Sequence, residues 1–122
     1  MMRKTILFAA LATAATFSLA QTPPAKTSAD GLTGPNGMTL YTFDKDQAAS
    51  GKSMCSGKCA ENWPPFYAAE GDKANGDFSI VTRDDGQRQW AYKGKPLYYW
   101  SKDAKVGDRT GDNYNNVWHV AK

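Results

Sequence analysis

Two cysteines, Cys55 and Cys59, are the residues of this chain whose type and spacing most directly suggest chemistry. In an oxidising compartment such a pair most often forms a disulfide, and closing so short a loop stabilises a fold by about 2 kcal/mol on the chain-entropy model. The alternative is a thiol pair that exchanges electrons or binds a soft metal such as copper(I), with Met54 and His119 as further ligands. Redox sites of the thioredoxin kind have two residues between their cysteines, whereas this pair has three. We therefore expect the disulfide and keep copper as the alternative cofactor.

A second group of chemically interesting residues comes from a stretch that occurs twice, LYTFDKD at residues 40–46 and LYYWSKD at residues 97–103. Each copy places a tyrosine, a second aromatic residue and an aspartate at the same spacing; these residues are Tyr41, Phe43 and Asp46, then Tyr98, Trp100 and Asp103. In a strand the two aromatic side chains share one face, and the aspartate at the strand end can accept hydrogen bonds from loop amides or a tyrosine hydroxyl.

The repeated residues have two interpretations. They are either two structural corners, one for each half of a domain, or an exposed aromatic platform that binds a sugar or an aromatic compound. We expect the corners, because a small domain needs its large aromatic side chains in the core first.

Catalysis by a nucleophile is not expected. His119 is the only histidine, and no serine lies in a G-x-S-x-G context. In a terminal strand, His119 points away from the face of its neighbours Trp118 and Val120, which places it at the surface or at the edge of the core. We therefore predict that the protein is not an enzyme and has no catalytic or cofactor-binding residue.

The first twenty residues predict a signal peptide. Arg3 and Lys4 precede an apolar run at residues 6–17, and small residues end the segment, which favours cleavage near Ala20. The apolar run is short for a membrane span, so we expect no transmembrane segment in the mature protein. A lipoprotein needs a cysteine at the cleavage point, where this chain has Gln21, and we therefore expect no lipid anchor.

The mature chain has little net charge. Cleavage removes Arg3 and Lys4 from the 15 basic residues and leaves 13 against 12 acidic ones, a net charge of about +1. No cluster of basic residues remains that could follow a phosphate backbone, so nucleic acid is not an expected partner. About a hundred residues suffice for one domain with one modest core.

The pattern along the mature chain predicts a mostly β fold. Residues 21–30 are rich in proline, alanine, serine and threonine and are expected to form a flexible tether. Residues 31–122 are expected to form one domain of short antiparallel hairpins with two related halves, about 31–66 and 78–121. A long ordered loop at residues 47–76 carries the cysteine pair. The expected strands are residues 38–43, 78–82, 88–92, 95–100 and 117–120.

Taken together, these features resemble a family of small bacterial exported proteins, described as predicted lipoproteins with a Yx(FWY)xxD motif or as the secreted repeat of unknown function. The resemblance covers about residues 32–120. It rests on both motif copies and on CSGKC at 55–59, WPP at 63–65, TRDDG at 82–86 and WHV at 118–120.

The resemblance implies export and a shared fold, and it implies no reaction. The chain departs from lipid-anchored relatives at Gln21. We expect a periplasmic or secreted binding or envelope-associated protein without enzymatic activity, whose partner is an unknown small molecule or a component of the envelope.

Overall fold

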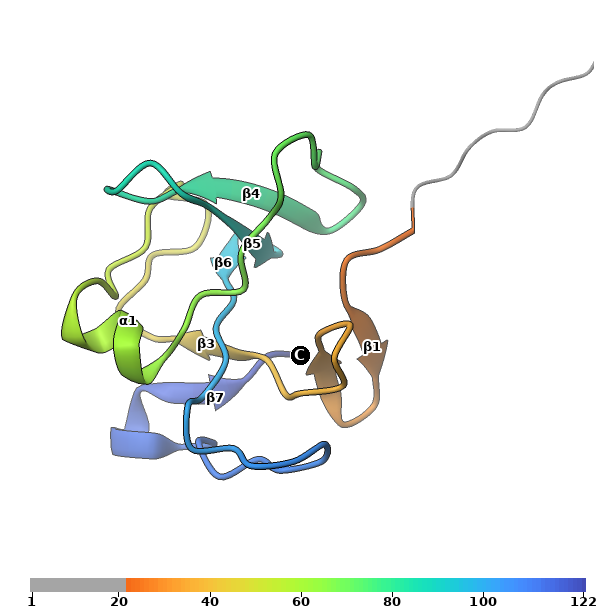
Figure 1. Ribbon diagram of the computed structural model, residues 1–122, viewed down its shortest axis with the longest axis vertical. Helices are drawn as coiled ribbons and strands as arrows, with labels where there is room; N and C mark the ends of the chain where they lie inside the picture. Colours follow the sequence, from red (N-terminus) through yellow and green to blue (C-terminus); the bar gives the residue numbers. More distant parts are fainter. Residues whose placement is uncertain (1–21) are drawn as a thin grey trace, which may run out of the picture.

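The computed structural model describes residues 22–122; the predicted signal peptide, its cleavage near Ala20 and Gln21 lie outside this range. Within it, short strands and turns dominate, and the strands form three small antiparallel sheets (Figure 1). This confirms the mostly β fold of short hairpins. The strands are β1 (Lys26–Ser28), β2 (Gly31–Thr33), β3 (Tyr41–Phe43), β4 (Phe78–Thr82), β5 (Arg88–Tyr92), β6 (Lys95–Pro96) and β7 (Trp118–Val120).

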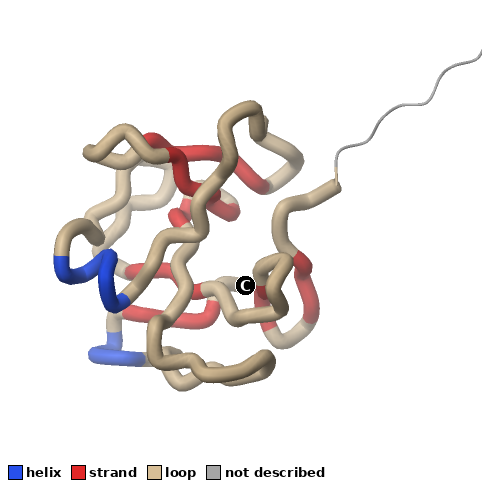
Figure 2. The backbone as a smooth tube through the Cα atoms, viewed as in Figure 1, coloured by secondary structure: helices blue, strands red, loops and turns tan. Residues whose placement is uncertain are grey.

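Helical structure in the described residues is limited to the α-helix α1 (Lys58–Asn62) and the 3₁₀ helix η2 (Tyr114–Asn116). Figure 2 shows both at one edge of the molecule, with loops making up much of the rest of the backbone. Neither has the length and apolar character that a membrane span requires.

The β4–β5 hairpin forms where the sequence predicts it. β4 pairs with β5 from Phe78↔Tyr92 to Thr82↔Arg88, and Gly86 adopts φ +87° in the connecting turn. Glycine adopts this left-handed conformation without steric cost, which explains its place after two aspartates. β6 then pairs with β5 at its far end and completes a three-stranded sheet.

The second motif copy forms a shorter regular strand than expected, because the chain changes partners along it. β6 ends at Pro96, and Leu97 N–H then bonds to Trp90 C=O. One residue later, Tyr98 exchanges both main-chain hydrogen bonds with Tyr41, at 2.8 and 3.0 Å. The two motif tyrosines therefore lie directly opposite each other, in the middle of the molecule.

The prolines at positions 64 and 65 fit beside this segment because neither has to donate a hydrogen bond. Pro64 accepts one from Tyr99 N–H through its carbonyl, and Phe66 N–H then bonds to Leu97 C=O. Pro65 lies between them opposite Tyr98. Proline is tolerated at such positions, where no ladder donor is needed.

The expected tether at residues 21–30 differs from the structure over the described residues. Lys26–Ser28 forms β1, which pairs with β2, and the Ala25 side chain is buried. The exposed polar side chains of β1 give no apolar pattern, so the strand exists through its pairing with β2. The buried Ala25 and the strand β1 therefore lie within residues 21–30, where the sequence pattern predicts a tether.

The core consists of two apolar clusters, on opposite faces of the motif strands. Leu40 and Leu97 belong to the first cluster, and the adjacent Tyr41 and Tyr98 belong to the second. This follows from the strand geometry, which turns successive side chains to opposite faces. The other buried members of the first cluster are Ala25, Leu32, Phe66, Phe78, Trp90 and Ala121, and those of the second are Cys55, Trp63, Trp100, Trp118 and Val120.

Candidate functional site

Each motif tyrosine donates a hydrogen bond to the motif aspartate of the other copy. The Tyr41 hydroxyl lies 2.6 Å from Asp103 Oδ2, and the Tyr98 hydroxyl lies 2.6 Å from Asp46 Oδ2. Both tyrosines are fully buried and both aspartates nearly so. We call these the crossed pairs. They join residues that are 62 and 52 positions apart and so fasten the two halves of the chain to each other.

Each oxygen of both carboxylates in the crossed pairs accepts at least one hydrogen bond. Asp46 Oδ1 accepts a bond of 2.5 Å from Met54 N–H, and Asp103 Oδ1 accepts bonds from the N–H and the hydroxyl of Thr110 at 3.0 and 2.7 Å. Burial raises the pKa of Asp46, whereas the bonds from Tyr98 and Met54 lower it. These acids are engaged in structural hydrogen bonds.

The tyrosines stay protonated in this setting. Burial raises the pKa of the Tyr41 and Tyr98 phenols far above the usual range, and the aspartate that each one faces adds to the rise. A phenolate next to a carboxylate would place two negative charges within one hydrogen bond. Each tyrosine therefore acts as a fixed donor.

The remaining motif aromatics take part in a stack that is also crossed. Phe43 stacks on Trp118 with ring centroids 4.2 Å apart, Trp118 on Trp63 at 3.8 Å, and Trp63 on Trp100 at 4.0 Å. Thus each motif aromatic packs on a tryptophan of the other half. Gly111 lies against this stack, where a Cβ would come within 2.7 Å of the Trp63 ring. Through the stack and the crossed pairs, the motif residues form a structural corner. Phe43 and Trp100 are the two end members of the stack.

A buried arginine supports one of the two pairs. Arg83 is 6% exposed and donates to Gln89 Oε1 at 2.8 Å, to Ser53 Oγ at 3.0 Å and to the carbonyl of Cys55. Ser53 Oγ in turn lies 2.6 Å from the Tyr98 hydroxyl. Arg83 Nε is the one buried side-chain nitrogen or oxygen without a partner in the described range. The guanidinium thus connects the cysteine loop to the Tyr98–Asp46 pair.

The two cysteines form the expected disulfide, with Cα atoms 5.2 Å apart. Cys55 is fully buried in the second apolar cluster, and the neighbouring Met54 side chain is exposed. Because the sulfurs are bonded to each other, neither is a thiolate in this state. The disulfide holds the loop whose main chain contacts Asp46 and Arg83.

His119 lies at the surface, and its hydrogen bonds do not involve the cysteine loop. Its ring nitrogens lie 2.7 Å from Asp44 Oδ2 and 3.0 Å from Asn113 Oδ1. Among residues 22–122 no group of three or more histidine, cysteine, aspartate or glutamate side chains is arranged to hold a metal. Cys55, Cys59 and His119, which the sequence offers as copper ligands together with Met54, form no such group in the disulfide form.

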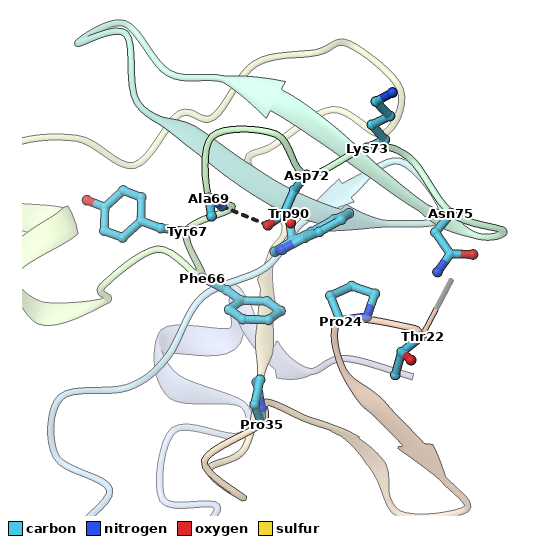
Figure 3. A pocket seen from close by; sticks show the side chains of 10 residues that line it. All are labelled: Thr22, Pro24, Pro35, Phe66, Tyr67, Ala69, Asp72, Lys73, Asn75 and Trp90. Atoms are coloured by element: carbon cyan, nitrogen blue, oxygen red, sulfur yellow. Dashed lines mark hydrogen bonds between the residues drawn. The ribbon is translucent and has the colours of Figure 1, made fainter. Parts of the chain in front are cut away.

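An open groove lies on the other side of the domain, next to the first apolar cluster (Figure 3). Its volume is about 310 Å³, at the lower end of the range of small-molecule sites. Phe66 and Trp90 line it together with Pro24 and Pro35, and the Tyr67 ring points away from them. The polar lining residues are Thr22, Asp72, Lys73 and Asn75. We call it the Trp90 groove.

The Trp90 groove contains a polar group that the fold leaves unused. Trp90 is 6% exposed, and its indole N–H has no hydrogen-bond partner among the described residues. The nitrogen is not fully buried, so solvent reaches this N–H. Asp72 accepts a bond from Ala69 N–H through Oδ2, which leaves Oδ1 available. A donor and an acceptor thus stand beside two aromatic rings, which is the composition of a small binding site.

The sequence gives no local signal for this groove. Trp90 alternates in a predicted strand like any core residue, and Pro24 lies in the expected tether. The groove exists because the N-terminal segment folds over the β4–β5 sheet. The stack has a clearer signal in the sequence, because each half has a tryptophan near its C-terminal end. These are Trp63 in the first half and Trp118 in the second.

Comparison with protein families gives one match, to the family described as the secreted repeat of unknown function, at residues 25–67 and 79–122. The two segments cover most of the chain, and each contains one motif copy; the first contains Trp63 of the stack and the second contains Trp100 and Trp118. The chain belongs to this family.

The family match agrees with the resemblance expected from the sequence and confirms two repeats within one chain. In the structure the secreted repeats are not two separate units, because the crossed pairs and the stack join them at every motif position. Comparison with curated proteins and with solved structures gave no significant match.

Proposed function

We propose that this secreted-repeat protein is a non-enzymatic binding module of the periplasm or the extracellular space, and that it binds its ligand in the Trp90 groove. The ligand is a small molecule or a component of the envelope. The observation that carries the proposal is the unpaired Trp90 indole N–H, which faces solvent in a groove that combines aromatic rings with polar side chains.

The distribution of polar groups supports this assignment. The polar side-chain atoms of the motif form hydrogen bonds inside the protein, since every carboxylate oxygen of Asp46 and Asp103 accepts one. A ligand platform built from the motif would need exposed rings, whereas Tyr41, Tyr98 and Trp100 are buried. The groove has the opposite character, with Trp90 and Asp72 still able to bond.

The same distribution of polar groups supports the proposal of a non-enzymatic role. General acid–base catalysis needs a titrating group within hydrogen-bond reach of a bound substrate. Asp46 and Asp103 are bonded to tyrosines in the interior, and His119 faces Asp44 at the surface. The Trp90 groove offers recognition groups, with Asp72 as its one carboxylate among the lining residues.

The experiment is a nuclear magnetic resonance screen of the mature protein. The probes are soluble fragments that comprise aromatic acids, monosaccharides and short blocked peptides. The indole N–H signals of the four tryptophans report separately on Trp90 and on the stack residues Trp63, Trp100 and Trp118. Trp90→Phe assigns the groove signal.

We expect at least one fragment class to shift the Trp90 signal and the backbone signals of Phe66 and Asp72 while the stack signals stay in place. Tyr114→Phe, which alters an exposed ring at the end of the stack, is the control and leaves binding unchanged. Shifts confined to Trp100 and Phe43, or no shift with any fragment class, would overturn the assignment.

A further inference from the structure

The Trp90 groove already has an extended segment of this chain as one of its walls. Thr22 and Pro24 line it, and Ala25 is buried in the same apolar cluster as Phe66 and Trp90. On the other side of this segment lies a second hollow of about 250 Å³, lined by Pro23, Ala25, Phe78 and Tyr92 among others. The N-terminal segment with its two prolines thus lies between two hollows that are both lined in part by aromatic residues.

The exposed parts of the aromatic side chains set the kind of ligand. Phe66 and Trp90 are only 7% and 6% exposed, so neither presents a fully open ring face to the groove. A sugar that stacks on an aromatic residue needs an open face. A small exposed aromatic area with an indole N–H instead matches a ligand with a carbonyl acceptor next to a compact apolar group.

A proline residue in a peptide supplies this combination. Its ring is apolar, the carbonyl before it is not engaged in a helix or sheet, and the chain around it is extended before binding. Because the extended form is already populated, little conformational entropy is lost on docking to an aromatic-lined groove. Main-chain N–H groups that flank the proline can donate to Asp72 Oδ1, which has no other partner in residues 22–122.

We propose that the ligand of the Trp90 groove is an extended, proline-containing peptide segment that lies beside Thr22–Ala25. A peptide carbonyl accepts the Trp90 indole N–H, and proline rings pack between Phe66 and the prolines Pro24 and Pro35. This inference rests on the proposed function, because it names the ligand class of the same groove.

The test is a titration of the mature protein with two blocked peptides of equal length, Ac-Ala-Pro-Pro-Ala-Pro-Pro-Ala-NH₂ and Ac-Ala-Gly-Gly-Ala-Gly-Gly-Ala-NH₂. The Trp90 indole N–H signal is followed for both. We expect the proline peptide to move this signal to lower field, as a new hydrogen bond requires, and the glycine peptide to leave it in place.

Three variants test the contacts. Trp90→Phe removes the donor and keeps an aromatic ring, and we expect it to weaken the proline peptide about two- to tenfold, the size of one net hydrogen bond. Asp72→Asn, which keeps an acceptor for Ala69 N–H, and Pro24→Ala test the rim in case Trp90→Phe does not fold. Tyr114→Phe is the control and keeps the wild-type affinity.

Each outcome has a consequence. Equal binding of both peptides overturns the role of proline. Binding that Asp72→Asn and Pro24→Ala leave unchanged overturns the placement in the groove. If neither peptide binds but another fragment class shifts the Trp90 signal, the ligand class is wrong and the binding module stands; if nothing shifts that signal, both proposals fail.

Discussion

The two crossed pairs have the same geometry and different surroundings. Asp46 lies beside a loop closed by a disulfide, and the buried Arg83 reaches its partner Tyr98 through Ser53. Asp103 is held instead by the N–H and hydroxyl of Thr110, and its described contacts include no cation. The repeat thus conserves the tyrosine–aspartate bond between its halves and varies the loop that supports the acid.

This difference teaches which part of the repeat makes the fold. In the second half the supporting loop has no disulfide, and Asn113, Asn115 and Asn116 adopt left-handed φ angles of 64°, 50° and 60°. Asparagine tolerates this conformation better than most residues. A compact loop is therefore built by covalent closure in one half and by asparagine turns in the other, around the same bonded pair.

The largest expected effect comes from removing a ring of a crossed pair. Tyr98→Ala and Tyr41→Ala each delete a fully buried aromatic side chain, which costs about 3–5 kcal/mol. This is a large part of the stability of a small domain, so both variants should be mostly unfolded by circular dichroism. Tyr→Phe at the same positions should cost about 1–3 kcal/mol, because a buried carboxylate loses its donor. A folded Tyr98→Ala protein of wild-type stability would show that this tyrosine is not needed for the structural corner.

The next effect is the response of Asp46 to pH. Burial raises the pKa of Asp46 in the folded state, so the folded protein binds this proton more tightly than the unfolded chain does. The corresponding stability is fully present below the unfolded pKa of about 3.9 and is lost as pH rises through the folded pKa. Urea unfolding from about pH 4 to neutrality should therefore show a loss in the wild type that is absent in Asp46→Asn.

Asp103→Asn tests the acid of the other crossed pair at a single pH. It should cost about 1–3 kcal/mol, since an amide N–H₂ faces donors that need an acceptor. An Asp103→Asn protein of wild-type stability would show that the Tyr41–Asp103 bond does not support the fold.

The disulfide should contribute less than either ring. Replacing Cys55 and Cys59 together by alanine should lower the free energy of unfolding by about 2 kcal/mol, and reducing the wild type should have the same effect. A thiol count on the natively purified protein should find none. Free thiols with bound copper would instead favour the soft-metal alternative.

The smallest effect is expected at the surface. His119 and Asp44 are 37% and 53% exposed, and exposed pairs of this kind contribute less than about 1 kcal/mol. His119→Gln should therefore leave the unfolding midpoint nearly unchanged, with Asp44→Asn as its control. A cost comparable to that of Tyr98→Phe would mean that His119 belongs to the corner.

Much of the fold could be predicted because its signals are local. The alternation at Phe78, Ile80 and Thr82, the Asp-Asp-Gly turn and the cysteine spacing each depend on a few neighbouring residues. They identified the β4–β5 hairpin and the disulfide correctly. Polar β1 has no such pattern, since its order comes from pairing with β2.

The candidate site was harder to predict because it depends on contacts between the halves. The spacing of Tyr98 and Asp103 suggests that they act together, whereas Tyr98 bonds to Asp46. Nothing in either copy specifies this exchange, which arises when the main chains of Tyr41 and Tyr98 pair. The Trp90 groove likewise needs the N-terminal segment in place above the sheet.

The crossing of the two pairs is tested most directly by double-mutant cycles on the free energy of unfolding. Tyr98→Phe with Asp46→Asn, and Tyr41→Phe with Asp103→Asn, should each show a coupling energy of about 0.5–3 kcal/mol, as expected for groups in one hydrogen bond. The cycles within one copy, Tyr41 with Asp46 and Tyr98 with Asp103, should be additive. Coupling within each copy and additivity between the copies would contradict the crossed arrangement.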